Sequence, residues 1–120
     1  AALAGRTFTL FGDGEQSRDF TYVADVVGAM RKAALSSWSG VANVGGGCEV
    51  TMNQVIGLLR MLGAPVRVVR APGQKGDARR TAADIALARG AFGFRPATGL
   101  RDGLAAMVAA ARAGRPLPVG

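Results

Sequence analysis

The stretch FGDGEQSRDFTYVADVV, residues 11–27, is the most informative part of the chain. The residues that lead into it, 7–11, alternate polar and apolar side chains, which predicts a strand. The glycines of the GDG sequence supply the backbone angles of a turn after that strand. Aromatic and β-branched residues at 20–23 predict a second short strand, and Val23, Val27, Met30 and Ala34 repeat at helical spacing, which predicts a helix over 24–35.

Further along, short apolar runs alternate with amphipathic segments. Residues 41–44 predict a brief strand, which the three glycines at 45–47 close. Thr51 and Gln54 fit a capping box, so we expect a helix to begin there and to end at Gly63. The other predicted elements are a strand at 65–69, a short helix from Asp84 to about Gly90, and a last helix from Thr98 that Gly114 and Pro116 end. Short strands and about four helices indicate an α+β domain over residues 1–120, or a fragment of an α/β domain.

The composition excludes several classes of function. A chain of 120 residues makes at most one small domain. Histidine is absent and Cys48 is the only cysteine, so we expect no internal disulfide, no Cys/His metal site and no histidine general base. No apolar run reaches transmembrane length and no signal-peptide pattern opens the chain, so we expect a cytoplasmic protein without a membrane partner.

The charge balance is strongly basic, with a net charge of +7. Such a charge attracts polyanions, but the thirteen Arg and two Lys are scattered rather than clustered. We therefore do not expect nucleic acid as a partner. A pocket for a diphosphate uses the same guanidinium chemistry with fewer charges.

Two pairs of residues are candidates for such a pocket. Arg18 follows the GDG turn and could present its planar fork to a phosphate, with Asp19 holding that fork; the simpler alternative is an exposed turn with a weak ion pair. In the later loop, Asp77 could accept hydrogen bonds from sugar hydroxyls and Arg79 or Arg80 could face a phosphate. The alternative there is a solvated basic loop.

The glycines at 45–47 stand between a predicted strand and a predicted helix, where a dinucleotide loop would lie. The third glycine of that motif is missing at Val50, and no acidic residue follows at the distance that holds a ribose. We therefore interpret the segment as a tight turn between packed elements. A Tyr-x-x-x-Lys pair is also absent, since Val26 follows Tyr22 four places on.

Four segments together resemble, in order, the C-terminal part of the extended short-chain dehydrogenases/reductases, the NAD-dependent nucleotide-sugar epimerases, dehydratases and decarboxylases. The resemblance spans about residues 7–113, and its segments are FGDGEQSRDFTYVADVV at 11–27, ANVGGG at 42–47, GDARRTAADI at 76–85 and FGFRPATGL at 92–100.

The resemblance implies a substrate-binding lobe that is normally packed on a Rossmann domain, which this chain lacks. Family members bind NAD(P) in that Rossmann domain, which also carries the catalytic Tyr and Lys, so this chain is expected to hold no cofactor and to be inactive alone. The lobe grips the nucleoside diphosphate of the substrate. The site residues that the resemblance implies are Thr9 and Phe11 beside the base, Arg18 at the diphosphate, Gln74 where many members carry an Arg, Asp77 at the ribose, and Arg79 as a compensating charge.

An alternative is a stand-alone, non-catalytic binding or interaction module derived from this family. In either case, a lobe without its Rossmann half exposes apolar surface and a strand edge. We therefore expect association with the Rossmann half of a parent enzyme, self-association or poor solubility.

Overall fold

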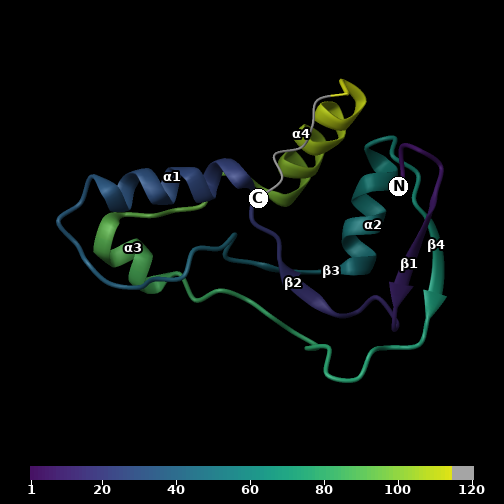
Figure 1. The fold of residues 1–120 in the computed structure, drawn as a ribbon, viewed down its shortest axis with the longest axis horizontal. Helices are drawn as coiled ribbons and strands as arrows, with labels where there is room; N and C mark the ends of the chain where they lie inside the picture. The colour runs from purple at the N-terminus through teal and green to yellow at the C-terminus, as the bar shows by residue number, and fades with distance from the viewer. Residues whose placement is uncertain (115–120) are drawn as a thin grey trace.

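The computed structural model describes residues 1–114, which form short strands and four α-helices. Figure 1 shows their arrangement. In chain order the elements are β1 Thr7–Phe11, β2 Ser17–Asp19, α1 Val23–Ala34, β3 Glu49–Thr51, α2 Met52–Met61, β4 Arg67–Ala71, α3 Ala86–Phe92 and α4 Leu100–Arg112. This confirms the α+β class and the four helices. Gly114 follows α4 with a φ of 65°, as predicted for a helix stop, whereas Pro116 lies outside the described residues.

The strands form two separate pairs. β1 and β4 are parallel, with Thr7 opposite Arg67 and Phe11 opposite Ala71. β2 and β3 are antiparallel, with Arg18 opposite Val50. An isolated parallel bridge between Ser17 and Arg80 joins the second pair to the segment that follows β4.

The helix α2 has the start and stop signals that its sequence predicts. The Thr51 hydroxyl accepts a hydrogen bond from the Gln54 amide at 3.2 Å, and the Gln54 side chain accepts one from the Thr51 amide at 2.9 Å. At the other end, Gly63 has a φ of 73°, and the Ala64 amide donates back to the Leu59 carbonyl. Local hydrogen bonds thus set both ends of this helix.

The helix α1 also forms where it is predicted, but its apolar stripe faces outward. Val27 and Met30 are 59% and 67% exposed, whereas Asp25 and Ala29 are buried. The Asp25 carboxylate accepts hydrogen bonds from the backbone amides of Ala97 and Thr98 at 3.1 and 3.0 Å, which ties α1 to the segment before α4. The buried face of α1 is therefore held by a carboxylate and small residues.

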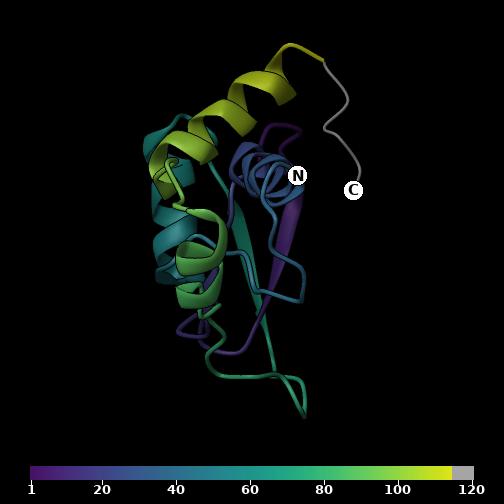
Figure 2. The ribbon, with the colours of Figure 1, turned by 90° about the vertical axis from the view of Figure 1, so that its left-hand side faces the viewer.

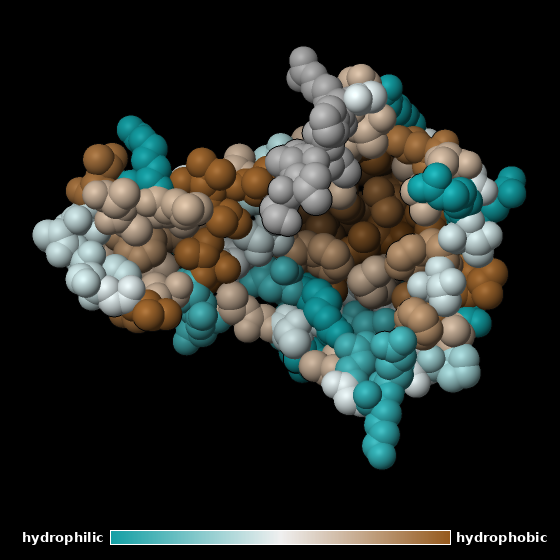
Figure 3. Space-filling view, viewed as in Figure 1, coloured by the Kyte–Doolittle hydropathy of each residue, from teal (hydrophilic) through white to brown (hydrophobic). Residues whose placement is uncertain are grey.

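Two small core clusters lie in different parts of the molecule. One contains Ala29, Ile85, Ala88 and Phe94 between α1 and α3, and the other contains Leu10, Ile56 and Val66 between the β1–β4 pair and α2. The two views in Figures 1 and 2 show a flat, elongated shape, with extents of 48 × 37 × 22 Å. The radius of gyration is 16.3 Å, whereas a compact chain of this length has about 14 Å. The chain therefore buries little surface for its size, and Figure 3 shows hydrophobic residues, in brown, on the surface around α1.

Two predicted strands are absent from the described residues. The second strand lies at Ser17–Asp19, so the aromatic residues at 20–23 come after it, and residues 41–44 are extended without a strand partner. Ala42 and Val44 instead pack against the α1–α3 cluster. The strand predicted at 65–69 and the helix predicted from Asp84 to Gly90 each form about two residues later in the chain.

Candidate functional site

The parallel pairing of β1 and β4 brings the carboxyl ends of both strands to one edge, where the GDG turn and the later loop begin. The Gly12 amide donates to the Ala71 carbonyl at 2.9 Å. A Cβ on Gly12 would lie 3.9 Å from the Cα of Gly73, so the two loops run close together there. Ligand sites in α/β proteins lie at such carboxyl ends of parallel strands.

A pocket of about 240 Å³ opens between these two loops. Its lining residues are Phe11, Gly12, Asp13, Gln16, Gly73, Gln74, Asp77, Ala78 and Arg79. Four of the six residues that the resemblance implies as substrate contacts thus surround one pocket. Thr9 is exposed on β1 opposite Val69 and is not among the lining residues.

Arg18 does not line this pocket itself, but it forms an ion pair with Asp77, which does. Its Nη2 lies 2.5 Å from Oδ1 of Asp77, 59 positions further along the chain, and its Nη1 donates to the Ser17 carbonyl at 2.7 Å. The two side chains are 30% and 42% exposed. Arg18 also lines a second pocket, of about 360 Å³, together with Asp19, Asn43, Val44 and residues 81–83. The Arg18–Asp77 pair therefore stands at the border between two pockets.

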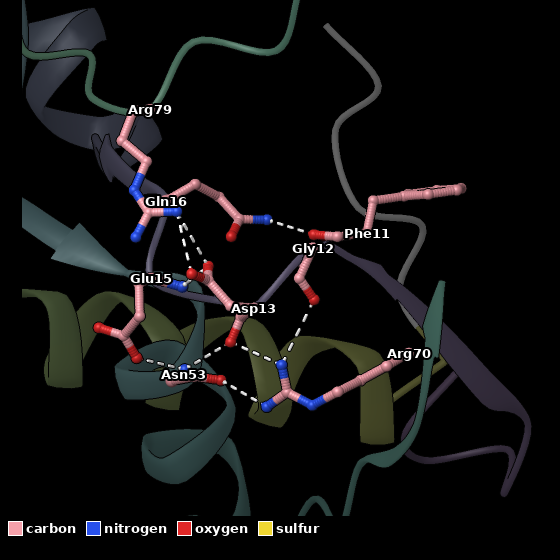
Figure 4. A network of polar contacts seen from close by, with 8 residues as sticks. All are labelled: Phe11, Gly12, Asp13, Glu15, Gln16, Asn53, Arg70 and Arg79. Carbon is pink, nitrogen blue, oxygen red and sulfur yellow. Dashed lines mark hydrogen bonds and ion pairs between the residues drawn. The ribbon is translucent and has the colours of Figure 1, made fainter. Parts of the chain in front are cut away.

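A second ion pair joins the same two loops at the first pocket. Arg79 Nη1 donates to both carboxylate oxygens of Asp13, at 3.2 and 3.0 Å, as Figure 4 shows. The Glu15 amide also donates to this carboxylate, at 2.9 Å. The Glu15 amide first, and then Arg79, hold the pKa of Asp13 below its ordinary value. Asp13 is therefore a charged carboxylate at neutral pH.

The GDG turn is fixed from its other side by β4 and α2. Arg70 donates to the Asp13 carbonyl at 2.6 Å, and Asn53 donates to the same carbonyl at 3.1 Å (Figure 4). Asn53 also donates to the Glu15 carboxylate at 2.5 Å. Asp13, Asn53 and Arg70 were not candidates from the sequence, because only the fold brings β4 and α2 to the turn.

Asp19 does not hold Arg18. Its carboxylate accepts hydrogen bonds from the amides of Gly46 at 2.7 Å, Gly47 at 3.3 Å and Ala83 at 3.3 Å. A Cβ on Gly45 would lie 2.5 Å from Oδ2 of Asp19, so the glycine segment needs its small residues to approach this carboxylate. The segment is a packed turn, as the sequence predicts.

The same contacts decide whether the glycine segment could hold a dinucleotide. A dinucleotide loop offers free backbone amides to a pyrophosphate at the start of a helix. Here the amides of Gly46 and Gly47 already donate to Asp19, and α2 begins only at Met52. The residues of this segment therefore do not fit the pyrophosphate of NAD.

Arg80 points to the β2–β3 pair instead of the pocket. Its guanidinium donates to both oxygens of Glu49, at 2.9 and 3.2 Å, and the buried Ser17 hydroxyl donates to Glu49 at 2.5 Å. Arg80 first, and then Ser17, lower the pKa of Glu49, and Glu49 in turn raises the pKa of Arg80. This cluster ties the later loop to β2 and β3.

Residues 1–114 contain no group of three or more Cys, Asp or Glu side chains that could hold a metal ion. Within the same range, no helix has the length and apolar character needed to cross a membrane.

Comparison with known proteins gives a consistent family. The model of the NAD dependent epimerase/dehydratase family matches residues 1–45. The UDP-glucose 4-epimerase of Mycolicibacterium smegmatis is 37% identical over 110 residues, which are 90% of this chain and 35% of that protein. The dTDP-glucose 4,6-dehydratase of an Actinoplanes strain is 34% identical over 116 residues, which are 94% of this chain and 36% of that protein.

Solved structures agree with this result. MoeE5 in complex with UDP-glucuronic acid and NAD superposes with a TM-score of 0.87 at 36% identity, over 93% of this chain and 38% of that chain. The UDP-glucose 4-epimerase of Thermotoga maritima with UDP-glucose gives a TM-score of 0.86 at 36% identity, over 94% and 37%. In sequence and in fold this chain is thus similar to part of the NAD-dependent nucleotide-sugar epimerases and dehydratases, and it spans about a third of the length of the curated relatives it matches.

Proposed function

We propose that residues 1–120 form the C-terminal, nucleotide-sugar-binding lobe of an NAD-dependent epimerase or dehydratase. The observation that carries this proposal is the Arg18–Asp77 pair. It brings a guanidinium and a carboxylate from distant loops to the border of two pockets beside the carboxyl ends of β1 and β4. Relatives with this fold were solved with UDP-glucose and with UDP-glucuronic acid.

Each residue of the site has a chemical task in this proposal. Arg18 and Arg79 offer planar forks that suit the oxygens of a diphosphate. Phe11 offers an exposed aromatic face at the pocket for the base, with the backbone of Thr9 and its neighbours beside it. Asp77 accepts hydrogen bonds from ribose hydroxyls, and the Gln74 amide contributes a neutral polar contact.

The lobe would bind and orient the substrate and exclude water from it, whereas the hydride chemistry belongs to NAD. We place the NAD site and the catalytic Tyr and Lys in a Rossmann part outside these 120 residues. The lobe by itself is then expected to bind the nucleotide sugar without converting it.

Calorimetry of the 120-residue chain with UDP-glucose, UDP-glucuronic acid and dTDP-glucose tests this function. We expect binding to at least one of them, and a loss of at least about tenfold in affinity for Arg18→Gln, since a charged hydrogen bond to phosphate contributes about 1.5–3 kcal/mol. Arg101→Gln removes the same charge from an exposed position on α4 and should leave the affinity unchanged. A folded chain that binds none of the three would refute the proposal.

One observation favours the alternative of an interaction module. The apolar stripe of α1 is exposed, with Val23, Val27 and Met30 on it. Contact with a protein partner would remove this apolar surface from water. The two functions differ in the calorimetric result: an interaction module associates with protein but gives no heat with nucleotide sugars.

A further inference from the structure

The segment of residues 72–78 lines the pocket of about 240 Å³ and is held in place at few points. All its residues are exposed. It is anchored before its start by the Gly12–Ala71 hydrogen bond and after its end by the Ser17 amide, which donates to the Arg79 carbonyl. Among the described residues, the one hydrogen bond that 72–78 makes outside itself is the Arg18–Asp77 pair.

The two residues of this pair line different pockets. Asp77 lines the pocket of about 240 Å³ with Phe11, and Arg18 lines the pocket of about 360 Å³ with Asn43. A nucleotide sugar is an elongated molecule, with a base at one end, a sugar at the other and the diphosphate between them. A ligand of this shape that reached both pockets would pass the contact between Arg18 and Asp77.

Arg18 keeps one hydrogen bond when its contact with Asp77 is lost. Its two terminal nitrogens have different partners: Nη1 donates to the carbonyl of its own strand neighbour Ser17, and Nη2 donates to Asp77. When Nη2 is released, the bond from Nη1 still orients the guanidinium. The freed nitrogen then faces the position that the Asp77 carboxylate has left.

We infer that Asp77 is an internal anion that pairs with Arg18, and that a diphosphate takes its place. This inference rests on the proposed function and adds a regulatory step to the same site. Exchange of partners joins the two pockets and frees the 72–78 segment, so that the Asp77 carboxylate can turn to the hydroxyls of the ligand.

The exchange costs little, because both side chains are partly exposed. Ion pairs of this exposure change an equilibrium by up to about fivefold. A diphosphate carries more charge than one carboxylate and can pair bidentately with a guanidinium, so it wins the competition.

Calorimetry with inorganic pyrophosphate tests the exchange, because this probe lacks the hydroxyls that Asp77 could contact. We expect Asp77→Asn to bind pyrophosphate about two- to fivefold more tightly than the wild type. Asp102→Asn makes the same change of charge at an exposed position on α4 and should bind it as the wild type does, apart from a small effect of net charge.

A second measurement follows the segment itself. Pyrophosphate should increase the fast backbone motion of residues 73–78 in NMR relaxation, and Asp77→Asn should show that motion without ligand. Pyrophosphate affinity of Asp77→Asn that is equal to or lower than that of Asp102→Asn would overturn the exchange while nucleotide-sugar binding by the wild type still supports the proposed function. Absence of binding by wild type and variants to pyrophosphate and nucleotide sugars alike would overturn the proposed function itself.

Discussion

Asp19→Asn should destabilise the fold, because three backbone amides converge on the Asp19 carboxylate. The Gly46 amide donates to Oδ1 at 2.7 Å, and the amides of Gly47 and Ala83 both donate to Oδ2 at 3.3 Å. An asparagine whose oxygen keeps the Gly46 bond places its NH₂ group against the other two N–H donors. Hydrogen bonds to a charged group contribute about 1.5–3 kcal/mol. Because the two lost bonds are long, we expect a total loss of about 2 kcal/mol in the free energy of unfolding.

A thermal melt followed by circular dichroism measures this loss. For a chain of about 120 residues, 1 kcal/mol corresponds to about 4 °C, so the midpoint should fall by about 8 °C. Asp102→Asn is the control, with the same charge change near the start of α4 and an expected cost below about 1 kcal/mol. If Asp19→Asn melts within about 2 °C of this control, the carboxylate does not anchor the glycine segment and the reasoning is wrong.

Three further predictions concern the loops and helices around the site. The Glu15 amide, and after it Arg79, lower the folded-state pKa of Asp13, so these contacts stabilise the fold above the ordinary pKa of 3.8, and this stabilisation is lost as the pH falls through the folded-state pKa. Arg79→Gln should raise the Asp13 pKa in an NMR titration, and an unchanged pKa would contradict the pair. Thr51→Ala removes the capping box and should cost about 1 kcal/mol in urea unfolding, whereas Thr51→Ser should cost less. The chain should self-associate through α1 in light scattering, and Val27→Lys with Met30→Lys should shift it to monomer; a monomeric wild type at the same concentration would exclude this surface.

Local signals in the sequence predict the helices well, because their causes lie within a few residues. The capping box of α2 needs only Thr51 and Gln54, and the stop at Gly63 needs only a residue that tolerates a positive φ. The stripe of α1 predicts the helix but not its buried face. Periodicity shows that one side is apolar, while the partner that covers it is set by elements far along the chain.

The strands are harder to predict, because a strand needs a partner. Residues 41–44 have suitable side chains but no neighbouring strand within the described residues, so they stay extended and pack against a core cluster. β4 forms two residues later than its apolar run suggests, because its register follows β1 from Thr7 to Phe11. Pairing, rather than composition, thus sets these boundaries.

The candidate site shows why neighbouring charges must be assigned one by one. Side chains at successive positions of extended backbone point to opposite sides. On β2, Arg18 therefore turns to Asp77 at the pocket border, while Asp19 turns to the glycine amides. The exposed turn with an Arg18–Asp19 ion pair, which the sequence left open, conflicts with this alternation.

The alternation of side chains along extended backbone also distinguishes Arg79 from Arg80. The sequence left open which of the two faces a phosphate. The segment bridges to Ser17 in extended conformation, so the two guanidiniums point apart. Arg79 meets Asp13 at the pocket, and Arg80 meets Glu49 on β3. Arg79 thus lines the pocket, and Arg80 ties the loop to the β2–β3 pair. Under the proposed function, a diphosphate competes for the Arg18–Asp77 and Arg79–Asp13 pairs, whereas the pair of Arg80 with Glu49 still holds the later loop to the strands.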